Sequence, residues 1–199
     1  VPVAHLRSCV AVRPLRLRGL VLCVSFVLVG VIVGPAVAAD QYTVVDLAPA
    51  QTVAYYGGPA AINASGTVAG SSGSPMRAFR YGTGLQTLGV LGGGASAESY
   101  AYGINTAGWV VGWSATGKNS PGPAHAFRHN GVSMTDLGVI KKGGFSAAYD
   151  INDQNLVVGE TSVTGATHAF KYDTQLRDLG TLPGYLDSRG YGVNASGKI

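Results

Sequence analysis

Cysteine, charge and helical periodicity are all scarce in this chain of 199 residues. Its 2 cysteines, Cys9 and Cys23, both lie near the N-terminus, so the rest can form neither a disulfide nor a cysteine metal site. Charged residues make up 12% of the chain and hydrophobic residues 46%, which argues against a disordered chain. Beyond the N-terminal segment no stretch repeats apolar residues every 3.6 positions, as an amphipathic helix would. We therefore expect an all-β protein held together by its core.

Basic charge is confined to the N-terminal segment. The formal net charge is +4, but four arginines and no acidic residue precede residue 40. The remainder carries ten basic residues (14 minus 4) and ten acidic ones, so it has no net charge. A nucleic-acid-binding protein needs a basic surface that faces the phosphates. The sequence therefore predicts no nucleic-acid partner.

The N-terminus has the layout of a secretory signal peptide. The arginines are followed by an uncharged stretch over residues 19–33 and then by small residues at Ala36 and Ala38. We expect a helical signal peptide over residues 1–38, cleaved after Ala38, and a secreted or cell-surface protein that meets the membrane only through this export signal. An uncleaved anchor is the alternative, because the uncharged stretch reaches about 20 residues when counted to Ala39.

A repeat fills residues 39–199. Three blocks recur in fixed order: a stretch that ends in Leu-Gly, an Ile-Asn turn followed by a valine pair, and a triplet that reads Arg-Ala-Phe once and His-Ala-Phe twice. The asparagines of the turn stand at positions 63, 105, 152 and 194, which are 42, 47 and 42 residues apart. A loop-like insert around residues 118–123 explains the longer interval. The predicted units are about 42–84, 85–132, 133–175 and an incomplete 176–199.

Each unit reads as four short strands. In the second unit they are predicted at residues 85–91, 101–105, 109–115 and 125–129, where Val, Ile, Tyr, Trp and Phe are punctuated by Gly. The Asn-x-x-Gly link predicts a hairpin turn, and the valine pair predicts a strand that is buried on both faces. Four antiparallel strands in about 42 residues are typical of a propeller blade. We expect tandem blades of a partial β-propeller, with a β-solenoid as the alternative, and a last unit that stops before its third strand.

The same blocks resemble a known family. The Asn-turn-Val-Val-Gly segment, the His-Ala-Phe triplet and the Asp-Leu-Gly-Thr-Leu segment at 178–182 are similar to those of HAF repeat proteins, over about residues 42–199. The resemblance implies tandem repeats of about forty residues in extracellular bacterial proteins, with no established activity. The first copy departs from the pattern, because Arg77 stands where the family has His.

Histidines and carboxylates are the first candidates for chemistry. His125 and His168 occupy the same place in their repeats, which allows either a shared metal site or a structural role; the structural role is favoured because Arg77 cannot bind a metal. His129 is not repeated and is expected at the surface. Asp150 opens a stretch that resembles a calcium loop, but Thr161 stands where the loop needs an acidic ligand, so a hairpin turn is favoured.

The remaining candidates point to no reaction. Asp46, Asp136 and Asp178 are repeat-equivalent and fit strand ends. No pattern brings together any two of the unrepeated carboxylates, which are Glu98, Asp150, Glu160 and Asp187, and no nucleophile elbow is present. The glycines at 92–94 read as a loop without a phosphate-binding helix. The sequence therefore assigns no catalytic, cofactor-binding or metal-binding residue.

Three tyrosines and two asparagines have two interpretations each. The tyrosines share one position, two residues before the Ile or Val of the turn, which indicates packing between units or a platform for sugar stacking. They are Tyr102, Tyr149 and Tyr191. Asn63 and Asn194 each open an Asn-Ala-Ser glycosylation triplet that coincides with the repeated turn.

The sequence favours a binding or interaction module over an enzyme. Its ligand would be extracellular: a glycan, a cell-wall polymer or a protein. The first alternative is a propeller-type hydrolase or lyase that acts on a polysaccharide, with active residues in loops or beyond the C-terminal end of this sequence. The second is a surface array without a ligand.

Overall fold

The computed structural model describes residues 58–117 and 123–199, and every helix or strand in these ranges is a β-strand. No helix long and apolar enough to cross a bilayer occurs within them. The expected signal peptide, its cleavage site, the alternative anchor, Asp46 and most of the insert at 118–123 lie outside the described residues.

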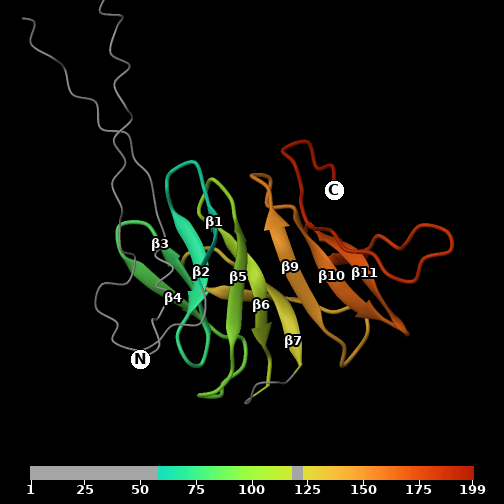
Figure 1. The fold of residues 1–199 in the computed structure, drawn as a ribbon, viewed down its shortest axis with the longest axis horizontal. Helices are drawn as coiled ribbons and strands as arrows, with labels where there is room; N and C mark the ends of the chain where they lie inside the picture. The colour runs from blue at the N-terminus through green and yellow to red at the C-terminus, as the bar shows by residue number, and fades with distance from the viewer. Residues whose placement is uncertain (1–57, 118–122) are drawn as a thin grey trace, which may run out of the picture. The chain divides into compact units, whose positions relative to one another are not determined.

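The strands form three sheets, each a meander of four consecutive antiparallel strands (Figure 1). The first contains β1 (Gly58–Ile62), β2 (Val68–Ser72), β3 (Arg77–Tyr81) and β4 (Leu85–Gly89). The second contains β5 (Ser99–Ile104), β6 (Val110–Ala115), β7 (Ala124–His129) and β8 (Met134–Gly138). The third contains β9 (Ser146–Ile151), β10 (Val157–Val163), β11 (Ala166–Tyr172) and β12 (Leu176–Asp178). The all-β prediction is confirmed for the described residues, as is the prediction of four-stranded antiparallel sheets.

The sheets begin at a different point of the repeat from the predicted units. The strand expected to open the second unit is β4, which pairs with β3 and completes the first sheet. A repeat has the same period wherever counting starts, so its spacing cannot show which four strands pair. Each observed sheet starts with the strand before the Ile-Asn turn and ends in the Leu-Gly block.

Neighbouring sheets pack face to face through their apolar side chains. β5 lies against β1, β2 and β3, and β9 lies against β5, β6 and β7. Val110 packs with Ala69 and Leu88 of the first sheet, whereas the next residue, Val111, packs with Ile151 of the third. Both valines are 0% exposed, which confirms that β6 is buried on both faces.

The Asn-x-x-Gly turn has the predicted geometry. The side-chain Oδ1 of Asn105 accepts a hydrogen bond from the N–H of Trp109 at 2.9 Å, and Gly108 has φ +79°. In the third sheet Asn155 takes the place of that glycine with φ +62°, in the left-handed region that Asn tolerates best after Gly. The stretch that resembles a calcium loop is this hairpin turn, as expected.

The same asparagines also join one sheet to the next. Nδ2 of Asn63 donates to the carbonyl of Asn105 at 2.9 Å, and Nδ2 of Asn105 donates to the carbonyl of Asn152 at 3.2 Å. Nδ2 of Asn152 in turn donates to the carbonyl of Asn194 at 3.0 Å. Because Nδ2 of Asn63 is already bonded, the structure favours a turn over a glycosylation site for its triplet.

Ser99 and Ser146, which begin β5 and β9, and the equivalent Ser188 form a second link. Oγ of Ser146 donates to the carbonyl of Gly138 at 2.6 Å and accepts from the N–H of Ala126 at 2.8 Å. Both groups belong to the second sheet, at the irregularity between Ala126 and Phe127 where the pairing of β7 with β8 shifts register. The serine satisfies a donor and an acceptor that the shift leaves unpaired. Ser99 and Ser188 make the same two bonds.

Residues 179–199 continue this pattern without forming a strand. The N–H of Ser188 donates to the carbonyl of Thr167 at 2.9 Å, just as the N–H of Ser99 donates to the carbonyl of Met76 at 3.1 Å. The Asn-x-x-Gly turn is closed at Asn194, whose N–H donates to the carbonyl of Lys198 at 3.0 Å. This segment therefore packs on the third sheet as β5 and β9 pack on the sheets before them.

The first prediction concerns the glycine after the valine pair. A Cβ on Gly159 would lie 1.9 Å from the carbonyl oxygen of Ala147 in β9, so Gly159→Ala must push two paired strands apart. We expect a loss of about 3 kcal/mol in the free energy of unfolding, measured with urea. Gly165→Ala is the control: φ is +80° but nothing lies within 4 Å of its Cβ, so it loses only about 1 kcal/mol. Equal losses would contradict this explanation of the Val-Val-Gly block.

The second prediction separates the two tasks of the asparagine. Asn152 closes its own turn and bonds to Asn194, whereas Nδ2 of Asn194 has no acceptor among the described residues. Asn152→Ala should therefore lower the free energy of unfolding by about 2–3 kcal/mol and Asn194→Ala by about 1 kcal/mol. Urea denaturation of both variants measures the difference, and equal losses would show that the turn alone matters and that the bond to the next turn contributes nothing.

Candidate functional site: an aromatic band across the second and third sheets

The repeated histidines meet the repeated aspartates. Nδ1 of His125 lies 2.8 Å from Asp136 of the neighbouring strand, and Nδ1 of His168 lies 2.9 Å from Asp178. In the first sheet the guanidinium of Arg77 instead donates to the carbonyl of Ala95 at 2.9 Å. Within residues 58–117 and 123–199 no three His, Cys, Asp or Glu side chains are grouped as metal ligands would be. The histidines thus hold one strand to the next, with a carboxylate as partner.

The two aspartates also shape the end of the sheet. Oδ1 of Asp136 accepts from the N–H of Gly138 at 2.7 Å, and Oδ1 of Asp178 accepts from the N–H of Gly180 at 2.7 Å. Both glycines have positive φ, at +80° and +69°. Asp178 is the last residue of β12, as expected for a turn or strand-end residue, whereas Asp136 lies in the middle of β8, two residues before its end at Gly138.

Three of the unrepeated carboxylates bind main-chain N–H groups. Asp150 accepts from the N–H of Val193 at 2.8 Å, and Asp187 accepts from the N–H of Thr167 at 2.9 Å. Glu98 accepts from the N–H of Met76, the residue just before β3, at 3.5 Å. Each bond links a sheet to the segment that packs on it. These three carboxylates therefore have roles in packing.

The prediction that His129 lies at the surface is wrong. It is 3% exposed, and its Nδ1 accepts from the N–H of Gly131 at 3.0 Å. β7 continues through this position, and His129 stands directly opposite Val110, whose side chain points into the core between the first and second sheets. Burial, followed by the nearby charge of Arg80, lowers the pKa of His129, so its imidazole is neutral near pH 7.

The repeated tyrosines form a row that crosses from sheet to sheet. The ring of Tyr149 lies between two others, with its centroid 5.6 Å from that of Tyr102 and 5.2 Å from that of Tyr191. Tyr102 and Tyr149 are half-buried, whereas Tyr191 is 70% exposed. The tyrosines therefore pack between units, and they also reach the surface.

Two further rings extend the row over the second sheet. Tyr100 stands two residues before Tyr102 on β5, so both side chains lie on one face of the strand. Trp113 of β6 stacks on Tyr100 with centroids 4.6 Å apart, and its indole N–H donates to the hydroxyl of Tyr102 at 3.0 Å. Both rings are half-buried.

The buried carboxylate of Glu160 holds the part of the row that lies on the third sheet. Glu160 follows the Val-Val-Gly of the third sheet, which is the position that Trp113 holds in the second. It accepts hydrogen bonds from the hydroxyl of Tyr149 and from Nε of Arg189, the latter at 2.5 Å. Burial, and then this bond to Glu160, raise the pKa of Tyr149 above its ordinary value. The phenol therefore stays protonated and acts as a donor, not as a base.

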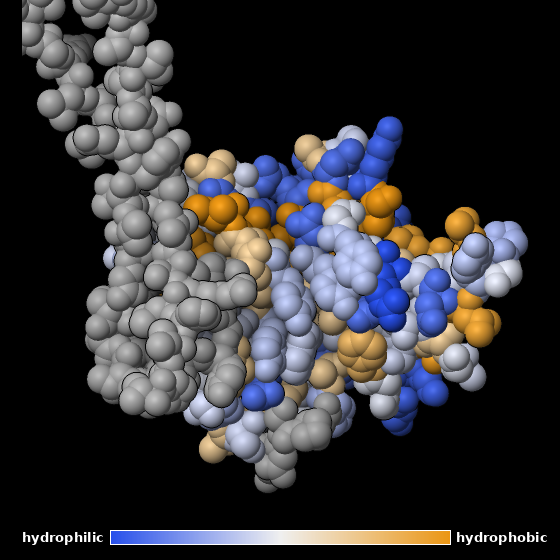
Figure 2. Space-filling model, viewed as in Figure 1, coloured by the Kyte–Doolittle hydropathy of each residue, from blue (hydrophilic) through white to orange (hydrophobic). Residues whose placement is uncertain are grey.

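We call these seven residues the aromatic band: Tyr100, Tyr102, Trp113, Tyr149, Glu160, Arg189 and Tyr191. Figure 2 shows weakly polar side chains, in pale blue, along the middle of the face that carries β5, β6 and β9. Ring surfaces with a few fixed polar groups are typical of sites that bind small or polymeric ligands. The guanidinium of Arg189, whose side chain is 43% exposed, adds donors at one end of the band.

Sequence reasoning found only part of the band. The three tyrosines were visible because they repeat, but Trp113, Glu160 and Arg189 stand at positions whose residue changes from unit to unit. Strand register places only Trp113 directly opposite a band tyrosine, Tyr100. Glu160 pairs with Ala147 and reaches Tyr149 through its side chain, and Arg189 lies outside the strands, so register gave no signal for either.

Comparison with known proteins found no matching family model, curated protein or solved structure.

The third prediction concerns the pH dependence of the His168–Asp178 pair. Burial raises the pKa of Asp178, but hydrogen bonds from Gly180 and His168 outweigh it and hold that pKa below its ordinary value. Since the folded pKa is lowered, the stabilisation is present above the unfolded pKa of about 4 and is lost as pH falls through the folded value. Asp178→Asn should lower the free energy of unfolding by less than about 1 kcal/mol at pH 7, because the carboxylate is partly exposed. Urea titrations at several pH values should show that the difference in free energy of unfolding between the wild-type chain and the variant disappears below about pH 4. A difference that grows below that pH would contradict this account.

Proposed function

We propose that this chain is a binding module of an exported protein and that the aromatic band contacts its ligand, a glycan of the cell surface or cell wall. The observation that carries the proposal is the line of five rings that continues from the second sheet across the third, with Arg189 beside its exposed end. Aromatic side chains with one polar atom suit a ligand that has both apolar ring faces and hydroxyl groups.

The fold supports a module built from blades. Three meanders of four strands pack face to face, and the first strands of the second and third sheets, β5 and β9, each lie against the sheet before them. We propose that these sheets are consecutive blades of a propeller-like array, as the resemblance to HAF repeat proteins implies. The N-terminal signal pattern supports export, and an exported chain would carry the band outside the cell membrane.

The contacts of the acidic side chains favour binding over hydrolysis. A glycosidase needs two carboxyl groups that are available to the substrate, one to donate a proton and one to attack or to activate water. Glu160 is 8% exposed and is bound to Tyr149 and Arg189. Asp150 and Asp187 each accept a main-chain N–H of a neighbouring segment.

The fourth prediction tests this proposal with a glycan array probed by the full chain. Tyr191→Ala and Trp113→Ala should each weaken binding of the selected glycan at least about tenfold, because each removes a ring of the band. Tyr185→Ala is the matched control: this tyrosine is 68% exposed, lies in the same segment as Tyr191, and is outside the band, so its removal should leave binding unchanged. Thermal unfolding of all variants separates lost binding from lost fold.

Three results would overturn the proposal. One is the absence of any glycan ligand, together with capture of a protein partner. Another is a glycan whose binding is unchanged by both band variants. The third is cleavage of the glycan that disappears in Glu160→Gln, which would make the chain an enzyme.

A further inference from the structure

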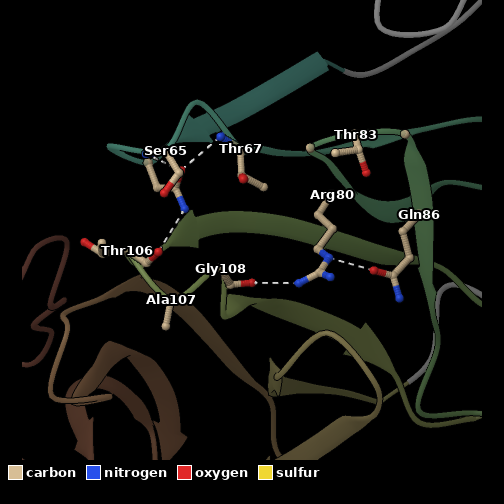
Figure 3. A pocket seen from close by; sticks show the side chains of 11 residues that line it. Ser65, Thr67, Arg80, Thr83, Gln86, Thr106, Ala107 and Gly108 are labelled. Atoms are coloured by element: carbon tan, nitrogen blue, oxygen red, sulfur yellow. Dashed lines mark hydrogen bonds between the residues drawn. The ribbon is translucent and has the colours of Figure 1, made fainter.

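A polar pocket lies between the first and second sheets, on the side of their turns. Its volume is about 380 Å³, and its walls come from the Asn-x-x-Gly turns of both sheets and from the hairpin between β3 and β4 (Figure 3). Its principal residues are Ser65, Thr67, Arg80, Thr83 and Gln86. None of these residues belongs to the aromatic band, so the pocket is an independent feature of the molecule.

Arg80 is held in the pocket by neutral partners only. Its Nε donates to Oε1 of Gln86 at 2.6 Å, and its Nη1 donates to the carbonyl of Gly108 at 3.3 Å. Gln86 is fixed in turn, because its Nε2 donates to the carbonyl of Gly131 at 2.9 Å. Among the residues that the structure describes, no carboxylate lies within ion-pair distance of this guanidinium. Within residues 58–117 and 123–199, the pocket thus presents a half-buried, oriented positive charge that has no counter-ion.

The equivalent arginine of the second sheet shows why the pocket is open. Arg128 follows the same Ala-Phe pair, but it lies between two rings, 4.7 Å from the centroid of Trp109 and 5.6 Å from that of Tyr172. In the first sheet Thr67 takes the place of Trp109, four residues after the turn asparagine. A threonine side chain is much smaller than an indole, so the space beside Arg80 is left unfilled.

Hydroxyl groups surround the open space. Figure 3 shows Ser65, Thr67 and Thr83 around the same hollow as the side chains of Arg80 and Gln86. Serine and threonine hydroxyls can donate or accept, and an arginine provides up to five N–H donors in a planar fork. This combination suits a ligand that carries one anionic oxygen group and several hydroxyls.

We propose that this pocket binds an anionic sugar-sized group, with Arg80 paired to its carboxylate, sulfate or phosphate oxygens. The volume lies within the range of small-molecule sites, which is about 300–1,000 Å³. The charge of Arg80 selects the anion, and the hydroxyl-lined walls select a polar body. The proposal does not depend on the function assigned to the aromatic band.

The fifth prediction is tested by nuclear magnetic resonance titration of the full chain with glucuronate, glucose 6-sulfate, glucose 6-phosphate and neutral glucose. At least one anionic sugar should shift the amide signals of Gly108 and Gly131, which lie beside Arg80, whereas glucose should not. Comparison of the three anions with inorganic sulfate and phosphate shows whether the sugar body contributes to binding.

Two variants remove the site in different ways. Arg80→Gln deletes the charge, and Thr67→Trp places in the first sheet the residue that fills the equivalent space in the second. Each should raise the dissociation constant at least about tenfold. Arg177→Gln is the control, since this arginine is exposed, pairs with Asp173 and lies outside the pocket, so it should leave binding unchanged.

The outcomes decide the proposal. Loss of binding in Thr67→Trp with a retained spectrum supports it even if Arg80→Gln fails to fold, because the tryptophan leaves Arg80 in place. The proposal is overturned if no anionic sugar shifts the signals of Gly108 and Gly131, if glucose binds as tightly as the anionic sugar that binds best, or if binding survives both variants. None of these results bears on the aromatic band.

Discussion

Each of the three sheets that the structure describes buries apolar side chains on both faces, and the rest of the structure follows from that constraint. Val110 faces the first sheet and Val111 the third, and both are fully buried only because a sheet lies on each side. Burial of one valine side chain contributes roughly 1.5–3 kcal/mol, which a solitary sheet would forgo on its open side. Stability is therefore shared between neighbours, as it is in other repeat proteins.

Apolar contact alone would allow one sheet to slide over the next, and the polar links prevent this. The asparagine of each turn donates to the carbonyl of the next turn, at one end of the interface. The serine that begins β5, and likewise the one that begins β9, satisfies two main-chain groups of the preceding sheet. Hydrogen bonds are directional and burial is not, so these links set the register between sheets while the core provides most of the stabilising energy.

The sequence was sufficient to predict the features that depend on local geometry. The turn needs a residue that accepts positive φ, so Asn155 could be recognised as the substitute for glycine. The two-faced strand follows from the valine pair. Features that depend on strand pairing could not be predicted: the partner of His125 is eleven positions away in the next strand, and His129 is buried because it stands opposite Val110. Trp113 joins the aromatic band only because β5 and β6 pair in one particular register.

Both candidate sites arise where an equivalent position changes its residue while the frame around it stays the same. After the Val-Val-Gly block, the second sheet has Trp113, which adds a ring to the band, and the third has Glu160, which fixes Tyr149 and Arg189. Four residues after the turn asparagine, Trp109 packs against Arg128 in the second sheet. The smaller Thr67 at the equivalent place in the first sheet leaves Arg80 open to the pocket. Residues that repeat mostly form the turns and the contacts that stack the sheets, so their replacement lowers the stability of the fold. The positions that differ from sheet to sheet are therefore the ones at which such an array can acquire a ligand.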